Sequence, residues 1–264
     1  WKGLYRYDGR SVINYSQLFN SKIGRKISAL YLDHEGKLWI GTYSEGLYVY
    51  DPKNHKIVSY ESINKTKTGN IINISGGRDN QIYVASYEGV FIYNCKINDF
   101  EAKTLSYSEN GDVYRLTMAF EDSKGTLWVG SDLGLLRYNA ISQKLENTGY
   151  LKGFYIHKIQ ELANGWIAVS SLKGTSFYEE INSVVYELKN SPLTADIISE
   201  RGESKTALTL ASQPGQLWIG TQNGLRIVNV TTGKLIARPA FKAGKEAKSF
   251  QVESVYEDRQ GIVW

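Results

Sequence analysis

The chain has 264 residues, and its 42% hydrophobic and 22% charged residues exclude wholesale disorder. Its 31 basic residues are interspersed with 27 acidic ones, giving a net charge of +4, without the clustered basic stripe typical of nucleic-acid-binding proteins. The single Cys excludes an intrachain disulfide framework and a multi-cysteine zinc site, whereas 25 Gly, 19 Tyr and 6 Trp favour tight turns and strands.

A repeat of about 45 residues runs through the chain. Its first half reads Asp-x-x-Gly-x-Leu-Trp-[Ile/Val]-Gly-[Thr/Ser]. Close copies of this motif lie at residues 33–42 and 122–131, its second part returns at 216–221, and a truncated copy lies at 257–264. Decayed copies lie at 79–86 and 164–170, and we align Tyr83 and Trp166 there with the Trp, and Ala85 and Ala168 with the first Gly. The Trp positions are therefore 39, 83, 128, 166, 218 and 264. Such a period is typical of repeat architectures.

Each repeat predicts four short antiparallel strands. The Asp-x-x-Gly segments at 33–36, 122–125 and 258–261 favour type I turns, because an Asp side chain can accept a hydrogen bond from the backbone two residues on. A second signature, which begins with Gly and an apolar residue and mostly ends in Tyr-Asp or Tyr-Asn, opens a third strand; its copies lie at 3–8, 46–51, 89–94, 134–139 and 224–229. Four antiparallel strands in this length form the blade of a β-propeller.

We therefore expect an all-β fold, with a single β-propeller region over residues 1–264. Its repeats cover residues 21–66, 67–110, 111–150, 151–200 and 201–245, with partial repeats at 1–20 and 246–264. Six repeats are visible. Because the chain starts at Trp1 and breaks a strand at both ends, we expect it to be a segment of a larger, seven-bladed propeller array.

The repeat and its Gly-Leu continuation resemble the two-component regulator propeller repeat, through Trp39, Trp128, Trp218, the truncated copy at Trp264 and two degenerate copies. The resemblance implies a periplasmic sensor of Bacteroidetes hybrid two-component histidine kinases that detects oligosaccharides and regulates transcription of polysaccharide-utilisation genes. In that family two propellers precede a β-sandwich, a membrane helix, a kinase core and a response regulator. This chain would be a non-enzymatic input domain without a cofactor. Its partners would be an oligosaccharide ligand, the adjacent propeller or β-sandwich domain and a second copy in a homodimer. It would touch neither nucleic acid nor the inner membrane, which a helix outside this chain would cross.

Loop residues that differ between copies at one structural position mark a candidate binding face. If the Trp strand is second in each blade, its exit loop shares one face with the loops that join blades, and the Asp-x-x-Gly turns lie on the other. The candidate ligand-binding residues on the exit loops are Tyr43, Glu45, Tyr87, Glu88, Asp132, Lys173, Gln222 and Asn223. Aromatic rings beside carboxylates suit a polyhydroxylated ligand, and binding residues are often on loops over a rigid scaffold. For any single residue, a solvated loop position is the simpler interpretation. The long blade-joining loops at 190–204 and 239–248 belong to the same face.

The other conspicuous residues favour structural roles. The recurring Trp predicts packing between blades rather than a sugar platform. The acidic pairs at 121–122 and 257–258 fall beside turns, and adjacent strand residues face opposite ways, so a hydrolytic pair is disfavoured. His34 lies inside a turn, and Cys95 lacks the cationic neighbours of a reactive thiolate. No catalytic or metal-binding motif is present.

Three functions compete at this point. A ligand sensor is favoured by the repeat. A protein-interaction scaffold would use the same loops without small-molecule affinity. A propeller lyase or glycosidase would need His, Arg or carboxylates converging at the ring centre, and the three His of this chain lie outside the exit loops.

Overall fold

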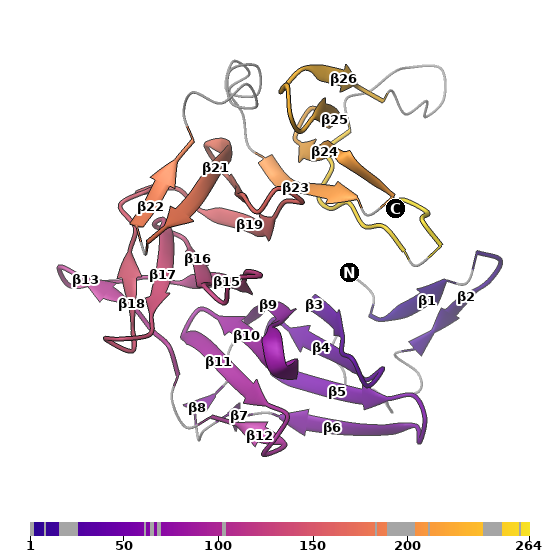
Figure 1. Cartoon of the computed structure of the whole chain (residues 1–264). Coiled ribbons are helices and arrows are strands. Elements are labelled where there is room, and N and C mark those ends of the chain that lie inside the picture. The colour runs from indigo at the N-terminus through magenta and orange to yellow at the C-terminus, as the bar shows by residue number, and fades with distance from the viewer. Residues whose placement is uncertain are drawn as a thin grey trace. The chain divides into compact units, whose positions relative to one another are not determined.

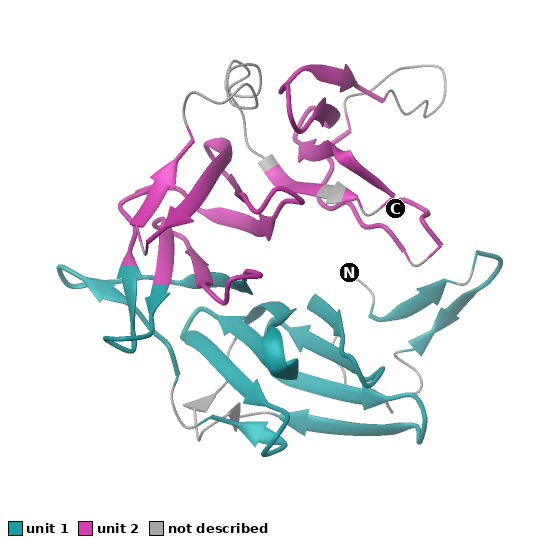
Figure 2. Cartoon of the chain, viewed as in Figure 1, with its two compact units in different colours: residues 1–121, 138–146 teal, residues 122–137, 147–264 magenta. Residues whose placement is uncertain are grey.

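The computed structural model describes residues 3–7, 9–15, 26–60, 62–63, 66–67, 70–101, 104–182, 184–188, 204–210, 212–239, 250–258 and 260–264. These residues form five four-stranded sheets in which neighbouring strands follow one another in the sequence (Figure 1). The chain divides into two compact units (Figure 2). Unit 1 comprises residues 1–121 and 138–146, and unit 2 comprises residues 122–137 and 147–264.

The sheets have the four-stranded form that the sequence predicts. Unit 1 contains the sheet of β3 (Ile27–Leu32), β4 (Leu38–Thr42), β5 (Leu47–Asp51) and β6 (Lys56–Tyr60), and the sheet of β9 (Ile71–Gly76), β10 (Ile82–Ser86), β11 (Gly89–Asn94) and β12 (Asp99–Phe100). Unit 2 contains the sheet of β19 (Ile156–Glu161), β20 (Ile167–Ser171), β21 (Gly174–Ile181) and β22 (Val184–Glu187), and the sheet of β23 (Ser204–Leu210), β24 (Gln213–Thr221), β25 (Gly224–Asn229) and β26 (Leu235–Ala237). The strands of the fifth sheet are β15 (Leu116–Glu121), β16 (Leu127–Ser131), β17 (Leu135–Asn139) and β18 (Lys144–Asn147).

Smaller elements complete the described fold. Three strand pairs are β1 (Tyr5–Tyr7) with β2 (Val12–Asn14), β7 (Ser62–Ile63) with β8 (Thr66–Lys67), and β13 (Ser108–Glu109) with β14 (Asp112–Val113). A short 3₁₀ helix, η2, spans Arg78–Asn80, and an isolated bridge joins Glu257 to Val263 near the C-terminus. Within the described part of the chain, no helix is long and apolar enough to cross a membrane.

The Asp-x-x-Gly segments form tight turns, as predicted. Asp33 Oδ1 accepts hydrogen bonds from two backbone N–H groups of its own turn, at 2.9 and 3.0 Å, and Oδ2 accepts one from the Trp39 indole at 2.8 Å. The same three contacts recur between Asp122 and Trp128 with their turn, and between Asp258 and Trp264 with theirs. One carboxylate thus fixes both the turn and the orientation of the Trp, because a charged acceptor makes the stronger kind of hydrogen bond. We call this arrangement the Asp–Trp clamp.

The predicted packing role of the Trp is confirmed at two positions. Trp39 and Trp128 are 2% and 0% exposed. Trp39 lies in one apolar cluster with Tyr93 and Phe100 of the next sheet, at ring-centroid distances of 4.7 and 6.4 Å. Trp218 differs, because Ser212 stands six residues before it in place of the Asp and its buried indole N–H has no hydrogen-bond partner.

The alignment of Trp166 with the other Trp residues is wrong. The Leu162 N–H donates to the Trp166 carbonyl as the Asp33 N–H donates to the Lys37 carbonyl, so Ala168 takes the Trp position. The first Gly is accordingly replaced by Ser170 and not by Ala168. Phe177 pairs with Ala168 across β20 and β21 and packs in the same apolar cluster, which restores the lost volume. The sequence misled because Leu162 has replaced the Asp that anchors the register.

Carboxylates one residue before the turns bridge to the preceding sheet. Glu121 Oε2 accepts from the Arg78 backbone N–H and Oε1 from the Arg78 Nε, both at 2.8 Å. Related contacts join the Ser123 N–H and hydroxyl to Glu161, and the Ser212 N–H to Glu257. The acidic pairs at 121–122 and 257–258 are therefore engaged in structural contacts.

Close packing explains the Gly of the Trp-Ile-Gly motif. A Cβ on Gly41 would lie 2.5 Å from Ile71 Cγ2 in the first strand of the following sheet. At the equivalent Gly220 it would lie 2.9 Å from the Val252 carbonyl oxygen. Real Cβ atoms do not approach so closely in a packed interior, so this position requires Gly wherever the next strand lies this near.

Candidate functional site

Four of the exit loops after the second strands share one pattern of hydrogen bonds. At the end of β4 the buried Thr42 hydroxyl donates to the Gly46 carbonyl at 2.8 Å and accepts from the Glu45 N–H at 3.0 Å. Ser131, Ser171 and Thr221 make the same pair of contacts at the ends of β16, β20 and β24. A buried hydroxyl therefore fixes each of these four loops, whereas the buried Ser86 hydroxyl at the end of β10 donates to the Glu88 carboxylate. The residues between the hydroxyl and the next Gly differ from loop to loop.

In unit 1, Tyr43 lies at a cavity of about 500 Å³. The cavity is lined by Tyr43, Ser44, Lys26, Ile27 and Asn70. The Tyr43 N–H donates to the Lys26 carbonyl at 3.1 Å, so the exit loop and the segment before β3 lie side by side, as predicted for one face. Tyr43 is 44% exposed, which leaves its ring available to a ligand. Neighbouring Glu45 is also exposed.

The second exit loop of unit 1 carries an aromatic–cation pair. The Arg115 guanidinium lies over the Tyr87 ring, 5.6 Å from its centroid. Glu88 Oε2 accepts from the Ser86 hydroxyl at 2.7 Å, which holds the carboxylate near the strand end. Next to Arg115, burial and then the hydrogen bond to Glu109 raise the pKa of Tyr114 to about 12, so this hydroxyl stays protonated. Cation–π contacts of this kind are worth about 0.5–1 kcal/mol at exposed sites.

The remaining predicted residues lie in unit 2. Lys173 is exposed, and its Nζ lies 5.9 Å from the centroid of the Phe154 ring. Gln222 and Asn223 are exposed on the loop between β24 and β25, and Asp132 is half-buried after β16. The eight predicted residues therefore fall into two groups, four in each unit, and their role in binding stays a prediction.

The sequence alone did not identify the partners of these loops. These partner residues each stand immediately before the first strand of a sheet. They are Lys26, Asn70, Arg115 and Tyr155. The Leu172 N–H donates to the Tyr155 carbonyl at 3.2 Å, just as Tyr43 does to Lys26. The signal that could have found them is this fixed offset from each repeat's first strand. The long loops at 190–203 and 240–248 lie outside the described residues.

Other reactive side chains lie in structural settings. Cys95 donates its thiol to the Asn80 carbonyl at 2.8 Å, and burial, followed by Asp33 and Glu35, raises its pKa. His34 lies in the first Asp-x-x-Gly turn, as expected. Over the ranges that the structure describes, no three His, Cys, Asp or Glu residues gather in a group that could hold a metal ion.

Comparison with known proteins identifies the repeat. The profile of the two-component regulator propeller family matches residues 21–44, which include β3, the Asp33 turn and β4. No curated protein is similar enough in sequence to count as a relative.

Solved structures share the fold. The chain is 17% identical, with a TM-score of 0.77, to the extracellular domain of the hybrid two component system BT3049 from B. thetaiotaomicron, covering 100% of this chain and 36% of that one. It is 18% identical, with a TM-score of 0.55, to the extracellular domain of the hybrid two component system BT4673 from the same organism. That match covers 92% of this chain and 39% of the other. Virginiamycin B lyase from Staphylococcus aureus is 13% identical, with a TM-score of 0.59, covering 80% of this chain and 68% of the lyase. This chain thus spans little more than a third of the two extracellular domains, and at such identities the likeness shows the fold alone. The chain is therefore an all-β protein of the propeller type that carries a two-component regulator propeller repeat.

Proposed function

We propose that this chain is a ligand-sensing input segment of a two-component sensor, located outside the cytoplasm. Two similar structures are extracellular domains of hybrid two component systems, and residues 21–44 match the family's repeat. Signal transduction from such a segment requires that the ligand bind one arrangement of the receptor better than another. The kinase core that responds to this arrangement would lie outside the chain. In a homodimer, the ligand would favour one of two arrangements of the two subunits.

The observation that carries a binding role is the exit-loop face of unit 1. Tyr43 offers an exposed ring at the mouth of a cavity with Asn70 and Lys26, so stacking and hydrogen-bonding groups lie together there. Tyr87 and Arg115 provide a second ring with a fixed cation. A flat ring beside donors and acceptors fits a polyhydroxylated ligand, and an oligosaccharide is our first candidate. Control of polysaccharide-utilisation genes would follow from that ligand.

The test is a thermal-shift and calorimetric screen of the purified chain against oligosaccharides, since a ligand of the native state raises the melting temperature. Tyr43→Ala should abolish a shift that Tyr7→Ala, a matched exposed Tyr on β1, leaves unchanged. Binding that survives Tyr43→Ala and Tyr87→Ala together would contradict the proposed site. Stable capture of a protein through these loops, with no oligosaccharide binding, would favour the interaction scaffold instead.

A propeller lyase is the second candidate, because virginiamycin B lyase shares the fold. Its support is weaker, since His34 lies in a turn, His55 is hydrogen-bonded to Tyr50 through Nδ1, and the ring of His157 lies tilted against that of Tyr155. Cleavage of any oligosaccharide that binds would be detected by product analysis in the same samples.

A further inference from the structure

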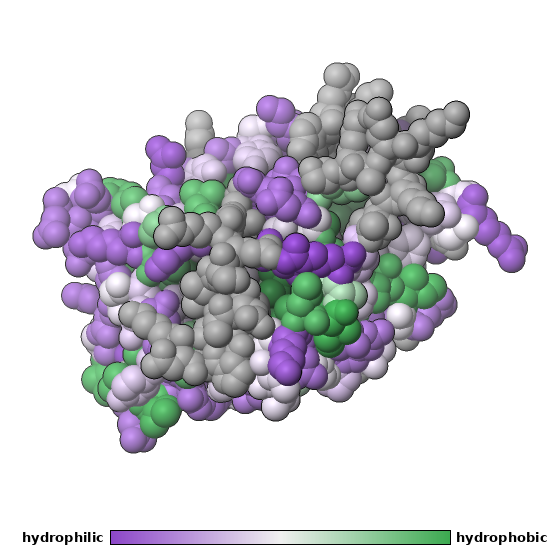
Figure 3. Space-filling view, turned by 90° about the horizontal axis from the view of Figure 1, so that it is seen from above, coloured by the Kyte–Doolittle hydropathy of each residue, from purple (hydrophilic) through white to green (hydrophobic). Residues whose placement is uncertain are grey.

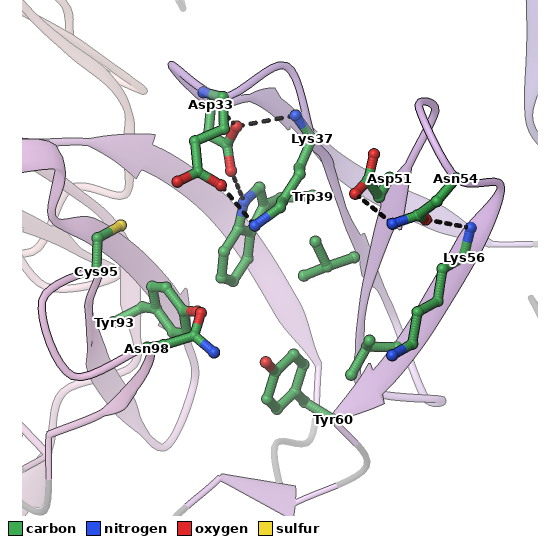
Figure 4. Close-up of a pocket in the computed structure, with 13 residues that line it drawn as sticks. Asp33, Lys37, Trp39, Asp51, Asn54, Lys56, Tyr60, Tyr93, Cys95 and Asn98 are labelled. Atoms are coloured by element: carbon green, nitrogen blue, oxygen red, sulfur yellow. Dashed lines mark hydrogen bonds and ion pairs between the residues drawn. The ribbon is translucent and has the colours of Figure 1, made fainter.

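A second cavity lies in unit 1, away from the exit loops. It has a volume of about 260 Å³ and lies between the sheet of β3–β6 and the sheet of β9–β12 (Figure 4). Trp39, Tyr60 and Tyr93 form its aromatic walls, and Asp33 and Asp51 are among the acidic groups that line it. This cavity could not be located from the sequence, because its walls come from strands distant in the chain.

The repeat shows what fills the equivalent space elsewhere. In unit 1, Val49 pairs with Trp39 across β4 and β5. In unit 2, Arg137 pairs with Trp128 across β16 and β17, and so takes the place of Val49.

The second position at which the two grooves differ is that of Cys95 in unit 1 and Glu180 in unit 2. Cys95 and Glu180 each stand two residues after an equivalent Tyr, since Tyr93 pairs with Ile82 and Tyr178 pairs with Ile167. Arg137 Nη1 donates to Glu180 Oε1 at 2.8 Å, and both side chains are 13% exposed. A largely buried guanidinium therefore occupies the groove of unit 2, whereas Val49 and Cys95 line a cavity in unit 1.

The surroundings of the cavity favour a positive charge. Its lining holds three carboxylates, of Asp33, Glu35 and Asp51, against two ammonium groups, of Lys37 and Lys56, so acidic groups outnumber basic ones. Lys37 is already paired with Glu35 at 2.5 Å, and Lys56 is exposed on the edge strand β6. Asp33 and then Glu35 add to burial in raising the pKa of Cys95, so the thiol is uncharged at neutral pH. After burial, the charge of Asp99 also raises the pKa of Tyr60. The rings offer faces on which a planar guanidinium can stack.

We propose that this cavity binds a small organic cation that carries a guanidinium group, in the place that the Arg137 side chain takes in unit 2. The ligand's guanidinium would lie against the rings of Trp39 and Tyr60 and near the carboxylates of Asp33 and Asp51. The volume admits one such group with a short aliphatic chain. The site is independent of the exit-loop face and of the proposed oligosaccharide.

The test uses agmatine as the probe, with isothermal calorimetry on the whole chain. The wild type should give saturable 1:1 binding that weakens with added salt. The double variant Val49→Arg/Cys95→Glu, which supplies the protein's own guanidinium and its partner, should bind at least tenfold more weakly. Tyr7→Ala, a change at an exposed Tyr on β1 outside both cavities, should bind as the wild type does.

A second variant guards against misfolding of the first. Asp51→Asn removes one carboxylate at the cavity without changing its volume, and we expect several-fold weaker binding of agmatine. Circular dichroism of each variant would establish that the sheets persist. Absence of saturable binding by the wild type, unchanged affinity in both variants, or equal binding of glucose and agmatine would overturn the proposal.

Discussion

The grooves beside Trp39 and Trp128 share a framework and differ in what fills them. Each Trp is held by its own Asp–Trp clamp and packs into a buried interior. The groove of unit 2 contains the Arg137–Glu180 ion pair, while the groove of unit 1 contains a cavity beside Val49. Around Trp39 and Trp128 the turn and the ring are thus the same, while the residues at two positions of the groove differ.

The surface mixes hydrophilic and hydrophobic side chains over the residues coloured in Figure 3. A buried ion pair is often no more stabilising than apolar residues of similar volume, so exchange between the two fillings costs little when both positions change together. This explains how one groove can hold charges and the other a Val and a Cys.

Among the variants that test the difference between the two grooves, Arg137→Leu is expected to change the free energy of unfolding most. The substitution leaves Glu180 buried without its cation, and we expect the free energy of unfolding to fall by about 3–5 kcal/mol. Urea unfolding would measure it. The control Arg137→Leu/Glu180→Leu should recover most of the loss, and Val49→Leu in the other groove should cost less than about 1.5 kcal/mol. A loss below about 1 kcal/mol for the single variant would show that the pair is not essential.

A smaller effect is expected from breaking the Asp–Trp clamp in each groove. In Asp122→Asn, the side chain can no longer accept from both the turn and the Trp128 indole, and we expect a loss of about 2 kcal/mol. Asp33→Asn should cost about 1 kcal/mol, because water in the adjoining cavity can satisfy the freed groups. Urea unfolding is again the measurement, with exposed Asp112→Asn as control. Equal losses at the two sites would contradict a hydrated cavity.

The sequence predicts what local chemistry determines. The turn at Asp33, the strands around Trp39 and the burial of that Trp all follow from short-range spacing, and the structure confirms them. The prediction failed at Trp166, where the anchoring Asp is absent and a conspicuous Trp stood two residues from the true position. Once a turn loses its Asp, only pairing with neighbouring strands defines the register.

The candidate sites show the same limit. The exit loop of Tyr87 could be located from the sequence, but its contact with Arg115 required two segments about 28 residues apart to meet in space. The cavity beside Val49 could not be anticipated, because it depends on a cross-strand neighbour and on Cys95 of another sheet. Both candidate sites therefore depend on pairs of positions whose proximity only the tertiary structure provides.

The pKa of the Cys95 thiol reports on burial and on charge in the unit 1 groove. Burial, then Asp33, then Glu35 raise the pKa of Cys95, so its thiolate forms only above the usual range of about 8.5. Alkylation by iodoacetamide should accordingly be slow at pH 8 and accelerate at higher pH than for a free thiol. Glu35→Gln should speed the reaction at pH 8, whereas Glu45→Gln on the exit loop should not. A labelling profile identical to that of glutathione would contradict a negative groove.

The smallest effect concerns the third Asp–Trp clamp, which lies at the surface. Trp264 is 56% exposed, so this clamp holds the turn at Asp258 without packing a Trp ring into the core. The hydrogen bonds from the Trp264 indole and then from the Ile262 N–H lower the pKa of Asp258. A lowered pKa in the folded state means that the stabilisation is present above the unfolded value of about 3.9 and is lost as the pH falls through the lower folded value.

The indole N–H resonance of Trp264 should therefore keep its position from pH 7 to about pH 4 and move only below it. In Asp258→Asn the resonance should occupy the shifted position at every pH, while global unfolding by urea changes little. A shift centred above pH 4 in the wild type would mean that the carboxylate is not stabilised by the indole. The Trp128 clamp, buried beside Arg137, and the Trp264 clamp then differ in consequence although their three hydrogen bonds are the same, because only the buried one removes its groups from water.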